Sequence, residues 1–403
     1  MTDSALKPRI TSIDWLRGLV MVLMLIDHTR DFIHAESYWH NPTDLSIISS
    51  ATFLTRWITH FCAPVFVFLA GLSISLQIQS GKSLASVRRF LWTRGLWLVF
   101  CEFTLVRIGK DFDLNFKEYL GMVQVIWALG ISMLIMAAII HFPRKWIFIF
   151  GLGLVLGHNL LDPIQAVVWK GPGTAFPGLF GSIWLLLHQT GSILPFGAKG
   201  PLLYVSYPLL PWPGVMALGF ALGHAFEATS LDRKRLLSRI GLACIVFFIF
   251  LRLMNVYGNP AQWSHQSTFF RTILSFINTT KYPPSLLFLL MTLGPALIVL
   301  AWREGRTDGF VGQALVTFGR VPMFFYLLQW PAARCLAILF SFAAGKPWRF
   351  LVAPADGYPP PNSGFSLLGL YSAWLLGLII FFPICRWFAN LKSRRTDWWL
   401  SYL

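Results

Sequence analysis

Long runs of apolar residues follow one another along most of the chain, separated by short polar segments. A helix needs about 20 mostly apolar residues to cross the hydrocarbon core of a bilayer. Ten runs meet this requirement, with edges defined to within a few residues: 13–30, 57–79, 89–108, 119–141, 145–162, 205–226, 236–256, 284–303, 315–342 and 366–388. No run alternates with the period of two that is typical of a membrane barrel, and no strand signal is strong. The pattern predicts an all-α polytopic membrane protein.

Some segments depart from a simple spanning helix. The run 145–162 is short and ends at His158-Asn159. The stretch 176–196 contains Gly, Pro and His188, which favours a re-entrant or interfacial segment. Prolines interrupt the segments 206–214, 281–285 and 319–329. Broken helices are tolerated at membrane depth where they line a cavity. We therefore expect proline-broken helices around an internal cavity.

Composition supports the membrane assignment. Of 403 residues, 56% are hydrophobic and only 12% are charged, about half the charged fraction of a soluble protein. This composition excludes a soluble enzyme, a coiled coil and a disordered chain. We expect one transmembrane domain over 1–403, with a cytoplasmic N-terminus at 1–12 and a cytoplasmic tail at 389–403. No cleavage site follows the first apolar run, so that run is expected to remain as a helix.

The net charge of +16 is spread in short clusters between the apolar runs. This distribution is typical of a membrane protein and argues against a nucleic-acid partner. With the N-terminus inside, 20 of the 33 Lys and Arg residues fall on the cytoplasmic side and 12 on the outer side. This asymmetry predicts ten spans with both termini in the cytoplasm. The five cysteines show no paired spacing, so we expect small core residues and no disulfide framework.

Most histidines fall on the outer side or at the outer ends of spans in this topology. They are His28, His34, His40, His60, His158, His188 and His265. Histidine titrates near neutral pH, so the set is consistent with a titratable site that opens away from the cytoplasm. Chance accumulation of histidine in loops is the alternative.

The first span carries the most ionisable residues. Arg17 lies near its cytoplasmic end, and Asp27, His28 and Asp31 lie near its outer end. Arg17 and His28 are separated by about 16 Å along a helix. Ionisable residues inside a span are costly and are therefore functional candidates. The alternatives are a membrane anchor for Arg17 and an interfacial position for His28, paired with Asp31.

Other spans contribute further polar candidates. Pro64 has no N–H, so the carbonyl of His60 loses its helical partner and the helix is expected to bend there. Glu102 is expected to be a buried partner for an arginine. Gly219 and Gly223 form a small-residue pair typical of a helix-packing face.

Arg17-Gly18 and Arg94-Gly95 both place an arginine at the cytoplasmic start of a span. Arginine is well suited to phosphate recognition. The spacing of His28, His34 and His40 does not match a zinc site on a helix, so no metal is expected. Phosphate loops and hydrolase motifs are absent.

Several motifs, taken in order, resemble a known family. They are Arg9–Gly18 with Asp27-His28, the stretch 55–71, Tyr207–Trp212, Lys281–Leu286 and Phe318–Pro322. They are similar to the catalytic domain family of heparan-alpha-glucosaminide N-acetyltransferase, in its bacterial branch, and the similarity extends over essentially the whole chain. Arg17 and His28 also resemble the arginine, ten residues, histidine pattern of acyltransferase-3 membrane enzymes.

The resemblance implies a transmembrane acyltransferase in a bacterial inner membrane. It would move an acyl group from cytoplasmic acyl-CoA to a glycan or other envelope acceptor outside, and acetyl is the acyl group expected first. His28 takes the position of the catalytic histidine and Arg17 that of its partner. The eukaryotic enzyme has its catalytic histidine in the first outer loop, where this chain offers His34 or His40. Gln329 stands where the family would have a histidine.

The residues themselves agree with this chemistry. His28 is expected to be the general base, oriented by Asp27 or Asp31, with His60 the next candidate. Arg17, Arg94 and Arg320 would hold the CoA phosphates. A broken helix or Lys281 would supply hydrogen bonds to the thioester oxyanion. The expected partners are the lipid bilayer, acyl-CoA and the acceptor, and a second copy of the chain, forming a homodimer, is a further candidate. A multi-span transporter of a small polar or anionic solute is the alternative, since proline-broken helices suit it equally well.

Overall fold

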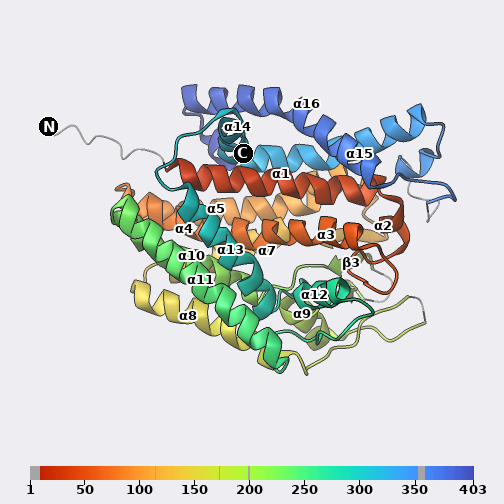
Figure 1. Ribbon diagram of the computed structural model, residues 1–403, viewed down its shortest axis with the longest axis horizontal. Coiled ribbons are helices and arrows are strands. Elements are labelled where there is room, and N and C mark those ends of the chain that lie inside the picture. The colour runs from red at the N-terminus through yellow and green to blue at the C-terminus, as the bar shows by residue number, and fades with distance from the viewer. Residues whose placement is uncertain (1–9, 114, 172, 198–199, 353–358) are drawn as a thin grey trace.

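The computed structural model describes residues 10–113, 115–171, 173–197, 200–352 and 359–403. The predicted N-terminal segment 1–12 lies mostly outside these residues, as does Lys199 of the charge count. The described chain is mostly helical, and its long helices run roughly along one axis (Figure 1). The helices are α1 Thr11–Ile33, α2 Ala35–Trp39, α3 Ser50–Ile58, α4 Cys62–Gln79, α5 Leu84–Cys101, α6 Arg107–Asp111, α7 Val125–Ile139, α8 Arg144–Gly157, α9 Leu179–His188, α10 Pro211–Leu222, α11 Ser230–Met254, α12 Phe269–Ile277, α13 Leu286–Arg303, α14 Phe310–Arg320, α15 Pro322–Ala343 and α16 Leu367–Arg394.

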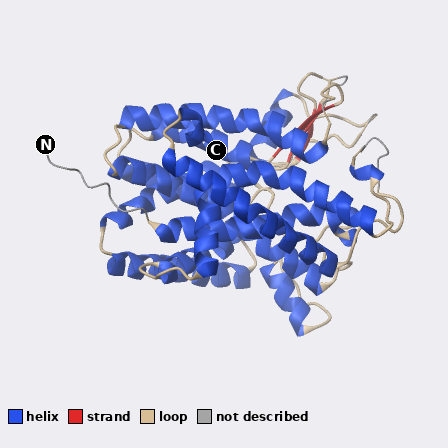
Figure 2. Cartoon of the chain, turned by 90° about the horizontal axis from the view of Figure 1, so that it is seen from above, coloured by secondary structure: helices blue, strands red, loops and turns tan. Residues whose placement is uncertain are grey.

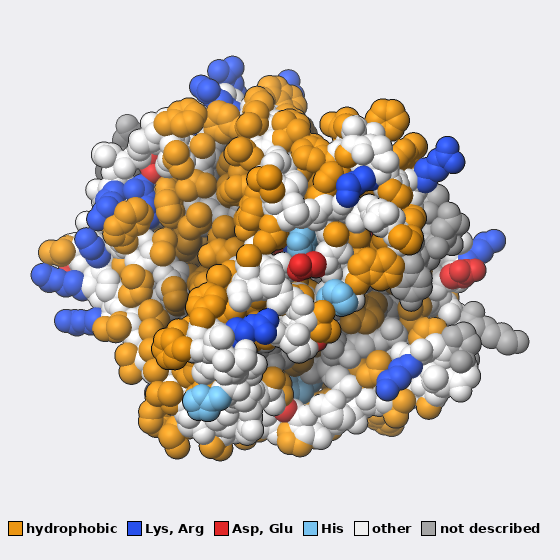
Figure 3. Space-filling view, turned by 45° about the vertical axis from the view of Figure 1, so that its right-hand side comes forward, with side chains coloured by type: hydrophobic (Ala, Val, Ile, Leu, Met, Phe, Trp, Pro, Cys, Tyr) orange, Lys and Arg blue, Asp and Glu red, His pale blue; other side chains and the backbone are white. Residues whose placement is uncertain are grey.

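Five helical stretches among the described residues are long and apolar enough to cross a membrane. They are the continuous stretch Ser50–Gln79 and the helices α11, α13, α15 and α16. Only 22% of the most apolar window of α11 and of α16 is buried inside the protein. The remaining apolar surface of these two helices therefore faces outward, where lipid would cover it. Figure 3 shows one side of the molecule, with apolar side chains over much of it and basic side chains mainly toward its edges.

The expectation of a purely helical chain is wrong in one region. A three-stranded sheet forms from β1 Tyr119–Val123, β2 Gly191–Ile193 and β3 Leu202–Val205, in the order β1-β3-β2. β1 and β3 pair in parallel, and β2 and β3 pair antiparallel. The sheet lies at one end of the helical bundle (Figure 2). The predicted spans 119–141 and 205–226 therefore each begin with extended chain, and 176–196 holds the short helix α9 followed by β2.

Two helices break where proline was expected to interrupt them. A 3-10 turn, η1 Thr59–Phe61, separates α3 from α4 just before Pro64. Within the predicted run 315–342, α14 ends at Arg320 and α15 starts at Pro322. Val321 between them has φ −129° and ψ 49°, so the helical hydrogen bonding is interrupted at this residue. The single predicted span is in fact two helices.

Helix α1 lies at the centre of the bundle and packs against α4, α14, α15 and α16. Its crossing with α14 depends on two glycines. A Cβ on Gly18 would lie 1.8 Å from the Leu315 carbonyl oxygen, and one on Gly319 would lie 1.9 Å from that of Asp14. The two backbones can approach this closely only because both residues lack side chains. In the same way Gly219 packs on α4, where a Cβ would lie 2.1 Å from the Phe68 carbonyl oxygen, as its motif predicted.

Glu102 does not pair with an arginine among the described residues, as had been expected. It begins a π-helical turn, Glu102–Val106, and accepts the backbone N–H of Trp127 at 2.9 Å. Its carboxylate therefore lies at the N-terminus of α7, where the helix dipole and the free N–H groups favour negative charge. The predicted core position of the cysteines holds for Cys62, Cys101 and Cys385, but Cys335 is exposed.

Candidate functional site

A cavity of about 980 Å³ brings together the three arginines that the sequence assigned to phosphate binding. Arg17 comes from α1, Arg94 from α5 and Arg320 from the end of α14. Lys82 and Lys392 also line this cavity, and its described lining contains no Asp or Glu. The sequence analysis had not singled out the two lysines. A cavity with five cationic side chains and no acidic ones favours an anionic ligand.

Each arginine of this large cavity is held differently. Arg17 donates to Asp14 at 3.1 Å, to the Gly319 carbonyl at 3.2 Å and to the Ser73 hydroxyl at 3.0 Å. It therefore ties α1 to α4 and α14 at the cavity wall. Arg320, in contrast, is exposed, and no hydrogen bond or ion pair of its side chain is seen within the described part of the chain.

The C-terminal segment covers part of the same cavity. It forms a 3-10 turn, η7 Trp398–Tyr402, which packs against α5. Arg94 donates to the backbone carbonyl of Ser401, and the Tyr402 hydroxyl donates to that of Thr93 at 2.7 Å. Ser401 and Leu403 line the cavity. The predicted tail is thus part of the cavity wall.

A second, smaller cavity of about 210 Å³ contains the predicted catalytic group. His28, Asp27, Asp31 and Lys281 all line it. Met24 and Val125 line both this cavity and the larger one, so the two share a wall. The distance of about 16 Å expected along α1 therefore separates a cationic cavity from a histidine-containing one.

His28 is 8% exposed and is positioned mainly by aromatic rings of α15. Its imidazole stacks on the Trp330 ring with centroids 3.7 Å apart, and it meets the Tyr326 ring edge-on at 6.1 Å. Its Nδ1 has no hydrogen-bond partner among the described residues. The structure thus brings Asp27 and Asp31 near His28, but neither carboxylate orients the ring through a hydrogen bond to Nδ1.

Both carboxylates bind cations instead. Asp27 pairs with Arg30 at 2.7 Å, with Arg56 at 2.5 Å and with Lys281 at 3.9 Å. Asp31 pairs with Arg30 at 2.8 Å. Asp27 is therefore the centre of a buried charge cluster that joins α1, α3 and the segment before α13. Lys281, expected at the oxyanion, belongs to this cluster.

The other candidate histidines lie outside both cavities. His60 is 1% exposed and packs edge-on against Phe288, with ring centroids 5.4 Å apart. His34 is buried, its Nδ1 lies 3.1 Å from the Ser37 hydroxyl, and its backbone bridges to Phe365. His40 is exposed beyond α2. His28 is thus the one histidine among the described residues that lines either cavity.

Besides the two lysines, four further lining residues that matter for the site were missed by sequence reasoning. They are Arg56, Lys110, Tyr326 and Trp330. Arg56 stands in the motif 55–71 and directly precedes the predicted span 57–79, and that position at the edge of an apolar run is the signal that could have identified it. Tyr326 and Trp330 could not have been identified from the sequence, because aromatic residues are common in apolar helices. Among the described residues, no group of three or more His, Cys, Asp or Glu side chains is placed to hold a metal ion.

Comparison with known protein families decides the assignment. The family model described as heparan-alpha-glucosaminide N-acetyltransferase, catalytic, matches residues 9–252, more than half of the chain.

The chain belongs to this family.

The resemblance seen in the sequence is thereby confirmed, although the match is shorter than expected. Lys281–Leu286 and Phe318–Pro322 lie outside the matched residues. No curated protein sequence matches the chain. The family assignment and the five apolar helices together indicate an integral membrane protein of an acetyltransferase family, and they do not favour the transporter.

Proposed function

We propose that this protein is an acetyl-CoA-dependent acetyltransferase that works across a bacterial inner membrane. Acetyl-CoA would bind from the cytoplasm, and a glycan or other envelope acceptor would take the acetyl group on the far side. One observation carries this proposal: a large cationic cavity and a small histidine-containing cavity share the wall formed by Met24 and Val125. A long donor with an anionic end and a reactive end matches this arrangement.

The donor would occupy the larger cavity. Its volume of about 980 Å³ lies at the upper end of ligand-binding cavities in proteins. The phosphates of CoA would bind Arg17, Arg94 and Arg320, whose planar guanidinium groups suit phosphate oxygens. The pantetheine arm would follow the apolar lining, which includes Met21 and Ile126, toward His28.

His28 would act as the general base in the smaller cavity. A neutral imidazole can accept the proton of an acceptor amine or hydroxyl and return it to the departing CoA thiolate. Its stack on Trp330 would fix the plane of the ring. Asp27 would act indirectly, by holding Arg56 and Lys281 in place around the acceptor. His60, which packs on Phe288, would support the fold rather than touch substrate.

The topology proposed with this function has ten crossings and both termini in the cytoplasm, within one domain over 1–403. It rests on the excess of Lys and Arg on the cytoplasmic side. Reporter fusions at both termini test it. An outward C-terminus would contradict it.

The function is tested with purified protein, radiolabelled acetyl-CoA, and glucosamine as the first acceptor. The wild-type protein should bind acetyl-CoA and release CoA when the acceptor is added. Arg320→Ala should weaken acetyl-CoA binding about tenfold, because a charge-assisted contact contributes roughly 1.5–3 kcal/mol. Arg144→Ala is the matched control, because Arg144 lines neither cavity.

His28→Ala separates binding from chemistry. It should retain acetyl-CoA affinity and lose acetyl transfer by a factor of roughly 10² or more, as expected for loss of general-base catalysis. Normal transfer by His28→Ala, together with an inactive His34→Ala or His40→Ala, would move the base to the outer loop. A wild-type protein that binds no acetyl-CoA would refute the proposed function as a whole.

A further inference from the structure

Two hydrogen-bond donors lie unused beside His28, at the boundary between the two cavities. The Tyr326 hydroxyl and the Trp330 indole N–H are both buried, and apart from each other they have no hydrogen-bond partner among the described residues. A buried donor without an acceptor destabilises the folded protein unless a ligand satisfies it. Two such donors close to one histidine therefore indicate an acceptor that the bound substrate supplies.

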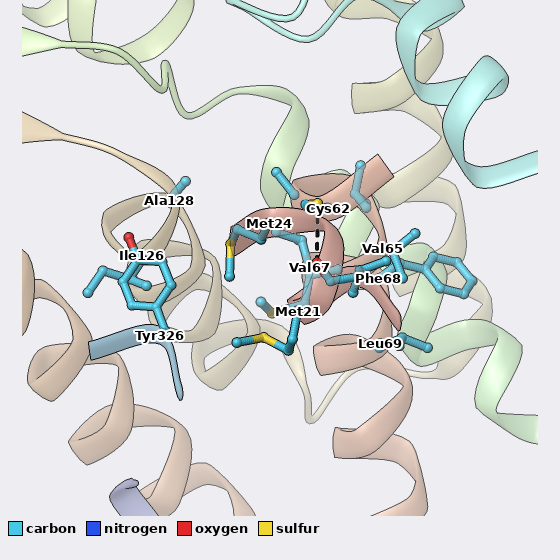
Figure 4. Close-up of a cluster of buried hydrophobic side chains, with 14 of the residues drawn as sticks. Met21, Met24, Cys62, Val65, Val67, Phe68, Leu69, Ile126, Ala128 and Tyr326 are labelled. Atoms are coloured by element: carbon cyan, nitrogen blue, oxygen red, sulfur yellow. Dashed lines mark hydrogen bonds between the residues drawn. The ribbon is translucent and has the colours of Figure 1, made fainter. Parts of the chain in front are cut away.

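The backbone geometry of α15 places the two donors together. Tyr326 and Trp330 are four residues apart, so they project from the same face of the helix. Tyr326 lines the larger cavity and Trp330 the smaller one. Tyr326 also faces Met21 and Met24 of α1 across the inner part of the larger cavity (Figure 4). The pair thus spans the boundary at which a donor's reactive end would meet an acceptor.

Packing alone does not explain the polar atom of Tyr326. The same helix places Phe325 at the preceding position, where it is fully buried and purely apolar. Phenylalanine at position 326 would preserve the edge-on contact with His28 and remove the unmatched hydroxyl. The buried hydroxyl therefore lowers the stability of the folded protein and is not needed for packing. Polar groups of this kind are typical of functional sites.

We propose that Tyr326 and Trp330 form the oxyanion-binding site of the acetyl transfer reaction, an inference that rests on the proposed function. When the acceptor nitrogen or oxygen attacks the thioester carbonyl carbon, the carbonyl electron pair moves onto oxygen. His28 takes the proton of the acceptor. The Tyr326 O–H and the Trp330 N–H donate to the resulting oxyanion. When the carbon–oxygen double bond re-forms, the carbon–sulfur bond breaks, and the CoA thiolate receives the proton from His28.

This assignment replaces Lys281 in that role. The Lys281 ammonium lies 3.9 Å from Asp27 and belongs to the buried charge cluster. Neither aromatic donor is hydrogen-bonded to a carboxylate among the described residues. Donors that are fixed before the reaction and aimed at developing charge are the most effective form of electrostatic catalysis.

The test compares Tyr326→Phe and Trp330→Phe with the wild-type protein, using acetyl-CoA and glucosamine. Loss of one oxyanion donor typically lowers kcat by about 10²–10³. Each variant should show a fall of this size, while the dissociation constant for acetyl-CoA changes by less than about twofold. Thermal stability of Tyr326→Phe should stay the same or rise, because a buried polar group without an acceptor has been removed at nearly constant volume.

Two matched controls isolate the effect. Tyr257→Phe removes a tyrosine hydroxyl that lies outside both cavities. Trp212→Phe removes a buried indole N–H that is likewise unpartnered but lines neither cavity. Both should retain wild-type kcat.

The outcomes are distinct. A kcat within about threefold of wild type in Tyr326→Phe would overturn the inference. An acetyl-CoA dissociation constant that rises as much as the rate falls would also overturn it, since the residue would then only bind the donor. Failure of the wild-type protein itself to bind acetyl-CoA would refute the proposed function and the inference with it.

Discussion

The buried charge cluster around Asp27 allows a stability prediction to be worked out from distances. Asp27 lies 2.5 Å from Arg56, 2.7 Å from Arg30 and 3.9 Å from Lys281. With an effective dielectric constant of about 20, these pairs correspond to roughly 6–7, 6 and 4 kcal/mol of Coulomb attraction before desolvation. Asp27→Asn preserves the shape of the side chain and leaves three cations close together without their shared anion.

The free energy of unfolding lost in Asp27→Asn is smaller than the sum of these attractions, because the cost of desolvating the charges offsets much of it. Removing one partner of a buried ion pair destabilises proteins by about 3–5 kcal/mol. With an unfolding entropy of about 2.1 cal/mol/K per residue, this corresponds to a fall in Tm of roughly 4–6 °C for a chain of this length. The assay is thermal unfolding of the purified protein in detergent, followed by tryptophan fluorescence.

The matched control is Asp31→Asn. The Asp31 side chain is 44% exposed and, within the described part of the chain, forms an ion pair only with Arg30. Its loss should therefore cost no more than about 1 kcal/mol. Adding Lys281→Met to Asp27→Asn should recover part of the lost stability, because one uncompensated cation is removed. Equal shifts in Tm for Asp27→Asn and Asp31→Asn would show that Asp27 is not the centre of the cluster.

Two further predictions concern helix packing and acid stability. Gly319→Ala should separate α14 from α1, because the added Cβ would lie 1.9 Å from the Asp14 carbonyl oxygen. Acetyl-CoA affinity and Tm should both fall. The control Gly153→Ala, with no atom within 4 Å of the added Cβ, should change neither quantity. Burial lowers the pKa of His34, so the unfolded chain binds the proton more readily and stability should fall as the pH drops below about 6.5. His34→Gln should flatten the dependence of Tm on pH between 7 and 5, and an unchanged profile would contradict this assignment.

Local sequence properties were enough to predict the class of protein and several of its membrane-length helices. The stretches around α11, α13 and α16 are apolar over a membrane-length segment, and that requirement concerns neighbouring residues only. The break before Pro64 and the one at Pro322 were also predictable, because proline lacks the N–H that a helix needs. The family resemblance likewise depended on short motifs in order along the chain.

The strands could not be predicted in the same way. β1 and β3 pair although about 80 residues of chain separate them, and each looks like the start of an apolar helix. A short apolar run fits a buried strand and a buried helix equally well. The choice depends on a partner strand that the local pattern does not reveal.

The candidate site likewise has features that the local sequence predicted and features that only the folded structure revealed. The sequence identified His28 and the three arginines as unusual residues, because charge inside an apolar run is a local feature. It also placed Asp31 one helical turn from His28, yet in the folded protein Asp31 pairs with Arg30 and the ring of His28 stacks on Trp330. Side chains more than 300 positions apart in the sequence become neighbours only when α1 packs against α15. The sequence by itself therefore singled out His28 and the arginines as candidates. Tertiary packing alone decided which side chains meet, since contacts between distant segments depend on the shape and crossing of whole helices.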